Sequence, residues 1–119
     1  MTAAEFRKLA LSLPEAVESA HMGHPDFRVA GKKIFATLGP DGSWGMVKLT
    51  PQQQASLVAL DADTYGPASG AWGHGGATIV QLRTAKEEVV RGALLDAWRN
   101  AAPKKMLNLI EKQNDSGGA

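Results

Sequence analysis

Cationic and aromatic side chains are interleaved between residues 26 and 50, and this arrangement could bind phosphate groups and flat rings. In extended strands, alternate side chains point to opposite faces. We expect one face to pack against helices through apolar residues, namely Phe27, Val29, Ile34, Ala36, Leu38, Val47 and Leu49. The opposite face then carries Arg28, Lys33, Phe35, Trp44, Met46 and Lys48, joined by Ile79 and Arg83 of a later strand. Cations bind backbone phosphates and flat rings stack on bases, so this face predicts nucleic-acid binding.

The same face has a second interpretation, in which Phe35, Trp44 and Met46 are covered by the C-terminal segment or by a second subunit. Lysine stems would then lie along its rim with their charges in water. Residues 26–50 hold four Lys or Arg against two Asp, an excess of only two positive charges. On this balance, packing ranks ahead of nucleic-acid binding. A small-molecule pocket ranks third, because no polar cluster would anchor the molecule.

Metal and catalytic sites are not indicated by the residue pattern. His21 and His24 are an odd number of positions apart, which in an extended chain places their side chains on opposite faces. The chain has no cysteine, so thiolate zinc ligands and thiol nucleophiles are excluded. No serine lies in a nucleophile-elbow pattern, and no carboxylate pair has a spacing that forces partnership. We therefore expect a non-enzymatic protein without metal or cofactor, with structural or surface histidines.

A glycine-rich segment spans residues 66–76. Its composition is similar to that of a phosphate-binding loop, but it leads into a strand instead of a helix and lacks the P-loop lysine. Without a helix N-terminus, the converging backbone amides that hold phosphate are missing. We expect an irregular connection with Trp72 packed against the domain.

Length and composition indicate one ordinary globular domain. The chain has 119 residues, of which 44% are hydrophobic and 21% charged. Thirteen Lys and Arg against twelve Asp and Glu give a net charge of +1, far from the balance of a strongly basic protein. No apolar run approaches the roughly 20 residues of a membrane-spanning helix, and the N-terminus lacks a secretory signal. We expect one domain over residues 1–112, a frayed tail over 113–119, no membrane partner and a cytoplasmic location.

Two helix-start signals locate the first two helices. A capping box from Thr2 to Glu5 precedes an apolar stripe that ends before Pro14. A second box, Thr50-Pro51-Gln52-Gln53, predicts a short helix through about Leu60. In each box, a threonine hydroxyl and a Glu or Gln side chain three residues later satisfy two free amides.

A third box, Thr84-Ala85-Lys86-Glu87, predicts the start of the longest helix. Its apolar stripe runs from Val89 to Ala101 and should cover one face of the sheet before Pro103 ends it. Residues 104–112 are expected to add an amphipathic turn or two.

Strands are expected between these helices, at residues 15–20, about 24–29, 33–38, 44–49 and 78–83. Glycine-containing turns at 30–31 and 39–42 connect the middle strands into an antiparallel meander. Residues 61–77 are expected to form a loop. The predicted fold class is α+β, with an antiparallel sheet of about four or five strands and a long C-terminal helix packed on one face.

Several of these segments match a known family when they are taken together. They are Gly23-His24-Pro25, Phe27-Arg28-Val29, Gly31-Lys32-Lys33-Ile34-Phe35-Ala36, Lys48-Leu49-Thr50-Pro51, and Trp72-Gly73 followed by Gly76. On these motifs the chain resembles the MmcQ/YjbR family over about residues 4–103. The resemblance implies a CyaY-like α+β fold, described as a double-wing design, with no established enzyme activity and with DNA as the ligand. A protein-interaction or self-association module is the alternative function.

Overall fold

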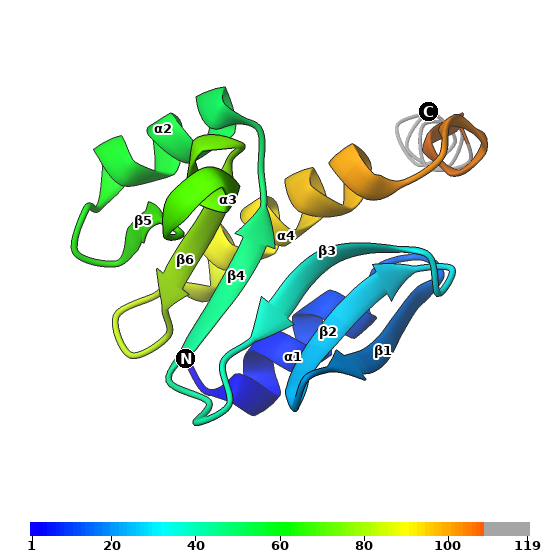
Figure 1. Cartoon of the computed structure of the whole chain (residues 1–119), viewed down its shortest axis with the longest axis horizontal. Helices are drawn as coiled ribbons and strands as arrows, with labels where there is room; N and C mark the ends of the chain where they lie inside the picture. Colours follow the sequence, from blue (N-terminus) through cyan, green and yellow to red (C-terminus); the bar gives the residue numbers. More distant parts are fainter. Residues whose placement is uncertain (109–119) are drawn as a thin grey trace.

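The computed structural model describes residues 1–108, which form a six-stranded antiparallel sheet backed by helices (Figure 1). The strand order is β1-β2-β3-β4-β6-β5. The strands are β1 (Ala16–His21), β2 (His24–Val29), β3 (Lys33–Leu38), β4 (Trp44–Lys48), β5 (Tyr65–Pro67) and β6 (Ala77–Gln81). The helices are α1 (Ala3–Leu11), α2 (Pro51–Leu60), α3 (Gly70–His74) and α4 (Glu87–Ala101). The predicted α+β class is confirmed, with a slightly larger sheet than expected.

The chain turns helical again after Pro103, as predicted, from residue 104 to the last described residue, 108. Met106 and Leu107 pack there, partly buried, against the hydrophobic core. The remainder of that predicted segment, the domain boundary at 112 and the predicted tail at 113–119 lie outside the described residues. Within residues 1–108, none of the helices combines the length and the apolar character needed to cross a membrane.

The core lies between the sheet and two helices, α1 and α4, which cover the same face (Figure 1). We call this the inner face. Trp98 of α4 is completely buried in the core, and its indole N–H donates to the Pro14 carbonyl at 2.8 Å. Phe6 of α1 packs tilted against Phe27 of β2, with ring centroids 6.3 Å apart. The long helix is therefore fixed both to the sheet and to the end of the first helical segment.

Two of the three predicted capping boxes are present. The Glu5 amide donates to the Thr2 hydroxyl oxygen at 3.1 Å, and the Gln53 amide donates to that of Thr50 at 3.2 Å. The third prediction is wrong, because α4 begins only at Glu87 and no side chain caps it. Thr84 lies instead in the turn after β6, where its hydroxyl shares a 2.7 Å hydrogen bond with Thr64.

A β-bulge between β2 and β3 sets the faces of the sheet. Phe27 pairs with Ala36, but Arg28 pairs with Ile34, so Phe35 is an extra residue on β3. Phe35 and Ala36 are both completely buried in the core. The prediction that Phe35 lies on the outward face is wrong, as is the prediction that Ile34 lies inward. Strict alternation fails here because a bulge shifts the side-chain phase by one residue.

The sheet is joined only briefly at its centre. β3 pairs with β4 over Ala36–Leu38 and Gly45–Val47, whereas β1 and β2 pair along their full lengths. Beyond this short ladder, the two strands diverge toward the ends that carry Lys33 and Lys48 (Figure 1). The sheet therefore has a first half of β1, β2 and β3 and a second half of β4, β6 and β5, with an opening between them.

The predicted loop at 61–77 contains regular structure. Tyr65–Pro67 forms the edge strand β5, paired with β6, and Gly70–His74 forms the short helix α3. A three-residue strand and a five-residue helix are too short to give a periodic sequence signal, and the glycines conceal them further. Figure 1 shows α3 in front of the sheet, on the face opposite α1 and α4.

The assignment of Phe35 to the core predicts a large effect of truncation. We expect Phe35→Ala to lower the free energy of unfolding by about 3–5 kcal/mol, because it removes a completely buried ring. Urea denaturation followed by far-UV circular dichroism measures this loss. Ile34→Ala, at the neighbouring half-buried position on the outer face, is the matched control and should cost clearly less. Equal losses would contradict the bulge register.

Candidate functional site

The outer face of the sheet, opposite α1 and α4, is hollowed where β3 and β4 diverge. A cavity of about 630 Å³ opens there, and we call it the basic cavity. The cations that line it are Arg28, Lys32, Lys33 and Lys48. No carboxylate belongs to its lining within the described chain. Trp72 and the C-terminal part of α4 complete its wall.

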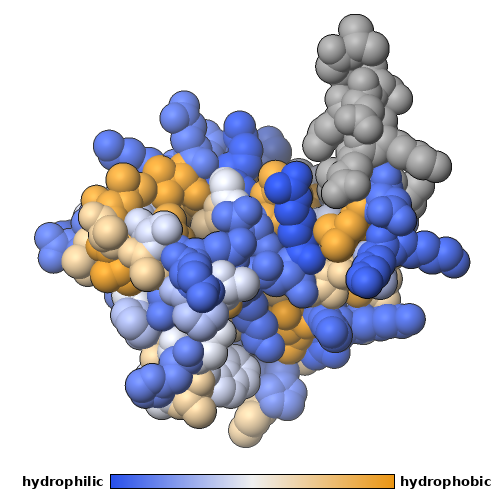
Figure 2. Space-filling view, turned by 90° about the horizontal axis from the view of Figure 1, so that it is seen from above, coloured by the Kyte–Doolittle hydropathy of each residue, from blue (hydrophilic) through white to orange (hydrophobic). Residues whose placement is uncertain are grey.

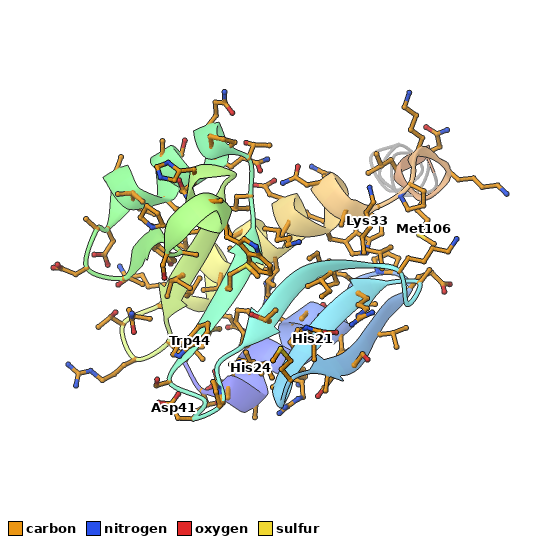
Figure 3. All side chains as sticks on the ribbon, viewed as in Figure 1. His21, His24, Lys33, Asp41, Trp44 and Met106 are labelled. Carbon is orange, nitrogen blue, oxygen red and sulfur yellow. The ribbon has the colours of Figure 1, made fainter. Side chains whose placement is uncertain are left out.

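A second cavity of about 750 Å³ adjoins the first and shares Ile34 and Trp72 with it. We call it the apolar cavity, because Trp44, Met46, Pro67 and Ile79 also line it. Figure 3 places Trp44 and Lys33 at opposite ends of the outer face. Seen from above, the molecular surface is largely hydrophilic, with apolar residues in separate patches (Figure 2). Together the cavities form one hollow with a cationic end and an aromatic end.

Arg28 is held in place by an ion pair with a residue of its own strand, β2. Its guanidinium donates two hydrogen bonds to Asp26, Nε to Oδ1 at 2.9 Å and Nη2 to Oδ2 at 3.1 Å. This side-chain hydrogen bond raises the pKa of Arg28. Asp26 is 1% exposed, so its charge depends on Arg28 for compensation. Arg28 therefore contributes an oriented guanidinium but little net charge.

The other carboxylate of residues 26–50, Asp41, also has hydrogen-bond partners close to it in the sequence. It accepts hydrogen bonds from the Ser43 amide at 3.0 Å and from the Ser43 hydroxyl at 2.8 Å. These bonds lower the pKa of Asp41, the amide contributing most. Asp41 lies in the β3–β4 turn, far from Lys33 (Figure 3). It therefore offsets none of the positive charge at the basic cavity.

Lys48 and Trp72 meet where the two cavities join. The Lys48 ammonium lies 5.1 Å from the centroid of the Trp72 ring, a cation–π contact. Trp72 is 60% exposed, so the prediction that it packs against the domain is wrong. Since α3 holds this ring on the outer side of β6, an aromatic surface faces the hollow rather than the core.

Two amide side chains fix the elements around the basic cavity. Asn100 of α4 donates through Nδ2 to the Lys48 carbonyl at 3.1 Å and to Gln53 Oε1 at 2.8 Å. Gln54 of α2 donates through Nε2 to the Gly73 carbonyl at 3.0 Å and to the Ala77 carbonyl at 2.9 Å. The backbone that carries Lys48 and the helix that carries Trp72 are thus tied to α4 and α2.

Glycines allow α3 to sit this close to its neighbours. A Cβ on Gly76 would lie 2.0 Å from the Leu49 carbonyl oxygen, and Gly76 has a φ of +111°. A Cβ on Gly73 would lie 1.8 Å from the Ala68 carbonyl oxygen. The glycine-rich segment therefore serves close backbone packing, which side chains larger than hydrogen would prevent.

Trp44 is positioned by a different glycine. An ideal Cβ on Gly39 would lie 2.4 Å from the Trp44 ring, so the indole lies directly across the Gly39 backbone. The Gly39 amide also donates to the Trp44 carbonyl at 2.8 Å. This packing leaves the ring half-buried and part of the wall of the apolar cavity.

The structure brings together three of the six predicted site residues. Arg28, Lys33 and Lys48 line the basic cavity, and Trp44 lines the adjoining one. Phe35 is buried in the core. Arg83 is not on the face, because β6 ends at Gln81 and the chain turns over the next three residues.

Three residues that line the basic cavity were not predicted from the sequence, namely Lys32, Trp72 and Asn100. Lys32 lies in the turn before β3, outside the alternation that selected Lys33. Asn100 is a polar residue within the span of the apolar stripe of α4 and gives no signal of its own, since its partners come from distant segments. Trp72, followed directly by Gly73 in the glycine-rich segment, was the one recognisable clue, because binding residues are often found on loops.

The two histidines face each other across a tight turn. Met22 and Gly23 have φ values of +52° and +80°, which closes a two-residue β-hairpin and makes His21 and His24 a cross-strand pair. The prediction of opposite faces is therefore wrong, and both side chains line the apolar cavity. Among residues 1–108, no cluster of three or more His, Cys, Asp or Glu side chains could hold a metal ion.

Comparison with known proteins gives a family and a fold. The family model described as YjbR matches residues 11–100. Among solved structures, the chain is similar to the Deinococcus radiodurans protein DR2400, a DUF419 domain, at 17% identity and a TM-score of 0.70. That similarity covers 82% of this chain and 75% of the other. A search of curated proteins gave no match.

The packing of α3 against the end of β4 predicts that Gly76→Ala is destabilising. The added methyl would meet the Leu49 backbone and force a strained φ, and we expect a loss of more than about 1 kcal/mol in unfolding free energy. Gly92→Ala is the matched control, because Gly92 lies exposed on α4 with nothing within 4 Å of an added Cβ. It should gain about 0.5–1 kcal/mol. Thermal unfolding of both variants measures the difference, and a stable Gly76→Ala protein would refute the close packing.

Proposed function

The chain belongs to the YjbR family, and we propose that it is a non-enzymatic binding domain that holds nucleic acid in the hollow between the halves of its sheet. DNA is the ligand that the family resemblance implies. The observation that carries the proposal is the segregation of charge. Lys32, Lys33 and Lys48 line one cavity with Arg28, whose ion-pair partner Asp26 lines the adjoining apolar cavity, and Asp41 lines neither.

Local charge matters more than net charge for phosphate binding. The protein as a whole carries only +1, but cations within one concave surface act together on a nearby phosphate. Among the described residues, Lys32, Lys33 and Lys48 form no ion pair with a carboxylate. Their ammonium groups can therefore displace counterions from a nucleic-acid backbone, which is the main source of such binding.

We further propose that the domain binds its ligand without catalysing a reaction. We also propose a cytoplasmic location. The basic cavity is lined by lysines, one guanidinium, one carboxamide and apolar groups. Lysines with their charges in a wide, open hollow suit a phosphate backbone, which needs neutralisation and no bond cleavage.

A protein-interaction or self-association module is the second candidate. Met22 at the β1–β2 turn is 86% exposed and Trp72 is 60% exposed, and both line the apolar cavity. Large exposed apolar side chains at the rim of an apolar hollow are typical of protein interfaces. This surface could bury a matching patch of a second copy.

Nucleic-acid binding predicts a specific loss on lysine removal. We expect Lys32→Ala and Lys48→Ala each to weaken binding of a fluorescein-labelled DNA strand and to reduce the slope of log affinity against log salt by about 0.7–0.9. Fluorescence anisotropy across a salt series measures both quantities. Lys8→Ala, exposed on α1 behind the sheet, is the control and should change neither. Arg28 is unsuitable for this test, because its removal would leave Asp26 buried without a partner.

An equal loss in the Lys8→Ala control would mean diffuse attraction instead of a site. Absence of DNA binding at low salt would overturn the proposed function.

Self-association predicts a concentration-dependent dimer that is insensitive to salt. Sedimentation velocity over a hundredfold range of protein concentration should then show a shift toward dimer, and Met22→Ser together with Trp72→Ser should abolish it. Salt should have little effect, because burial of apolar surface does not depend on screening. A protein that stays monomeric at the highest concentration would exclude self-association.

A further inference from the structure

The hollow has a shape and lining that favour unpaired bases. Trp44 of β4 and Trp72 of α3 both line the apolar cavity, and Met46 and Ile79 lie between them on neighbouring strands. Trp44 and Lys48 lie on the same face of β4, four residues apart, so about 13 Å of strand separates them. A base can stack on aromatic rings inside a hollow only if it is unpaired and can enter the hollow.

Phosphates and bases would find separate partners along this path. The basic cavity begins where Lys48 contacts Trp72, and the two cavities share that ring and Ile34. The Lys48 ammonium lies over the Trp72 ring, while Trp72 as a residue stays 60% exposed. A strand that crosses the hollow would therefore meet cations and rings in turn, as single-strand binding surfaces provide.

A duplex fits the same surface poorly. Its bases are stacked inside, so they cannot reach rings that lie within a hollow. Proteins that read a duplex insert a helix or a two-stranded ribbon into its groove. The β1–β2 hairpin would be such a ribbon, but its single Lys or Arg is Arg28 near the end of β2, and that guanidinium is already paired with Asp26.

We propose that the hollow binds single-stranded nucleic acid, with unpaired bases stacked on Trp44 and Trp72 and the backbone on Lys32, Lys33 and Lys48. This inference rests on the proposed function and specifies its ligand. Stacking on aromatic side chains supplies affinity without reading the base sequence, because every base has a flat face. The domain would accordingly bind unpaired segments with little sequence preference.

Three labelled ligands of equal length, about 12 nucleotides, test this. They are an oligothymidine strand, an abasic strand that keeps only sugar and phosphate, and a duplex. We expect the oligothymidine strand to bind at least about fivefold more tightly than the other two. It should also quench tryptophan fluorescence, and the quenching reports Trp44 and Trp72, because Trp98 is completely buried.

Substitutions assign the effect to the rings. Trp72→Ala should weaken oligothymidine binding at least about fivefold and leave abasic binding unchanged. Leu60→Ala is the matched control, since Leu60 is 63% exposed on α2 and lies outside both cavities. Trp44→Phe should retain binding that Trp44→Leu loses, and circular dichroism confirms that each variant is folded.

Equal affinity for all three ligands would overturn the base-stacking inference and leave phosphate binding in place. Failure of all three to bind at low salt would overturn both the inference and the proposed function.

Discussion

One extra residue in β3 determines both the core and the hollow. Because Phe35 has no partner on β2, it turns inward beside Ala36, and both side chains enter the core. Ile34 consequently faces outward and lines both cavities. A bulge also bends its strand and increases the local twist. We attribute to this bend the early separation of β3 from β4, whose ladder is confined to Ala36–Leu38 and Gly45–Val47.

The long helix serves the core and the hollow with different residues. Val90, Leu94 and Trp98 are completely or almost completely buried against the sheet. Near its C-terminal end, the helix presents Ala97 and Ala101 to the basic cavity. Small side chains at these positions leave the space between β3 and β4 open, where a leucine or phenylalanine would fill it. The same helix thus closes the core along most of its length and also forms the floor of a cavity near its C-terminal end.

The sequence was informative wherever a local rule governs the structure. The capping boxes at Thr2 and Thr50 depend on contacts three residues apart, and both formed as predicted. The box at Thr84 failed because its hydroxyl found a tertiary partner, Thr64, which no local pattern reveals. The bulge at Phe35 likewise depends on the register between two strands. Alternation assigned residues to faces correctly along β4, where no bulge intervenes.

The predicted site was partly recovered for the same reason. Alternation located Lys48 and Trp44 correctly because β4 is regular, but it placed Phe35 outside and extended β6 too far to include Arg83. Lys32 and Asn100 could not be found, since a turn and a helix end bring them to the cavity through tertiary contacts alone. The outer face does carry cations and aromatic rings, as predicted, but which residues belong to it depends on contacts that form only in the folded chain.

The distribution of the two carboxylates explains how a nearly neutral protein can present a cationic cavity. Counting residues 26–50 gives four cations against two acids, a weak signal. In the folded chain, Asp26 accepts two hydrogen bonds from Arg28, and Asp41 accepts two from Ser43. The lysines are left as compact, flexible point charges, which suit a phosphate backbone whose exact position varies along a strand. Arg28, held rigid by its partner, is better suited to shaping the wall than to following such a ligand. The positive charge of this face therefore comes from lysines, because the two acidic side chains of the same stretch already have other partners.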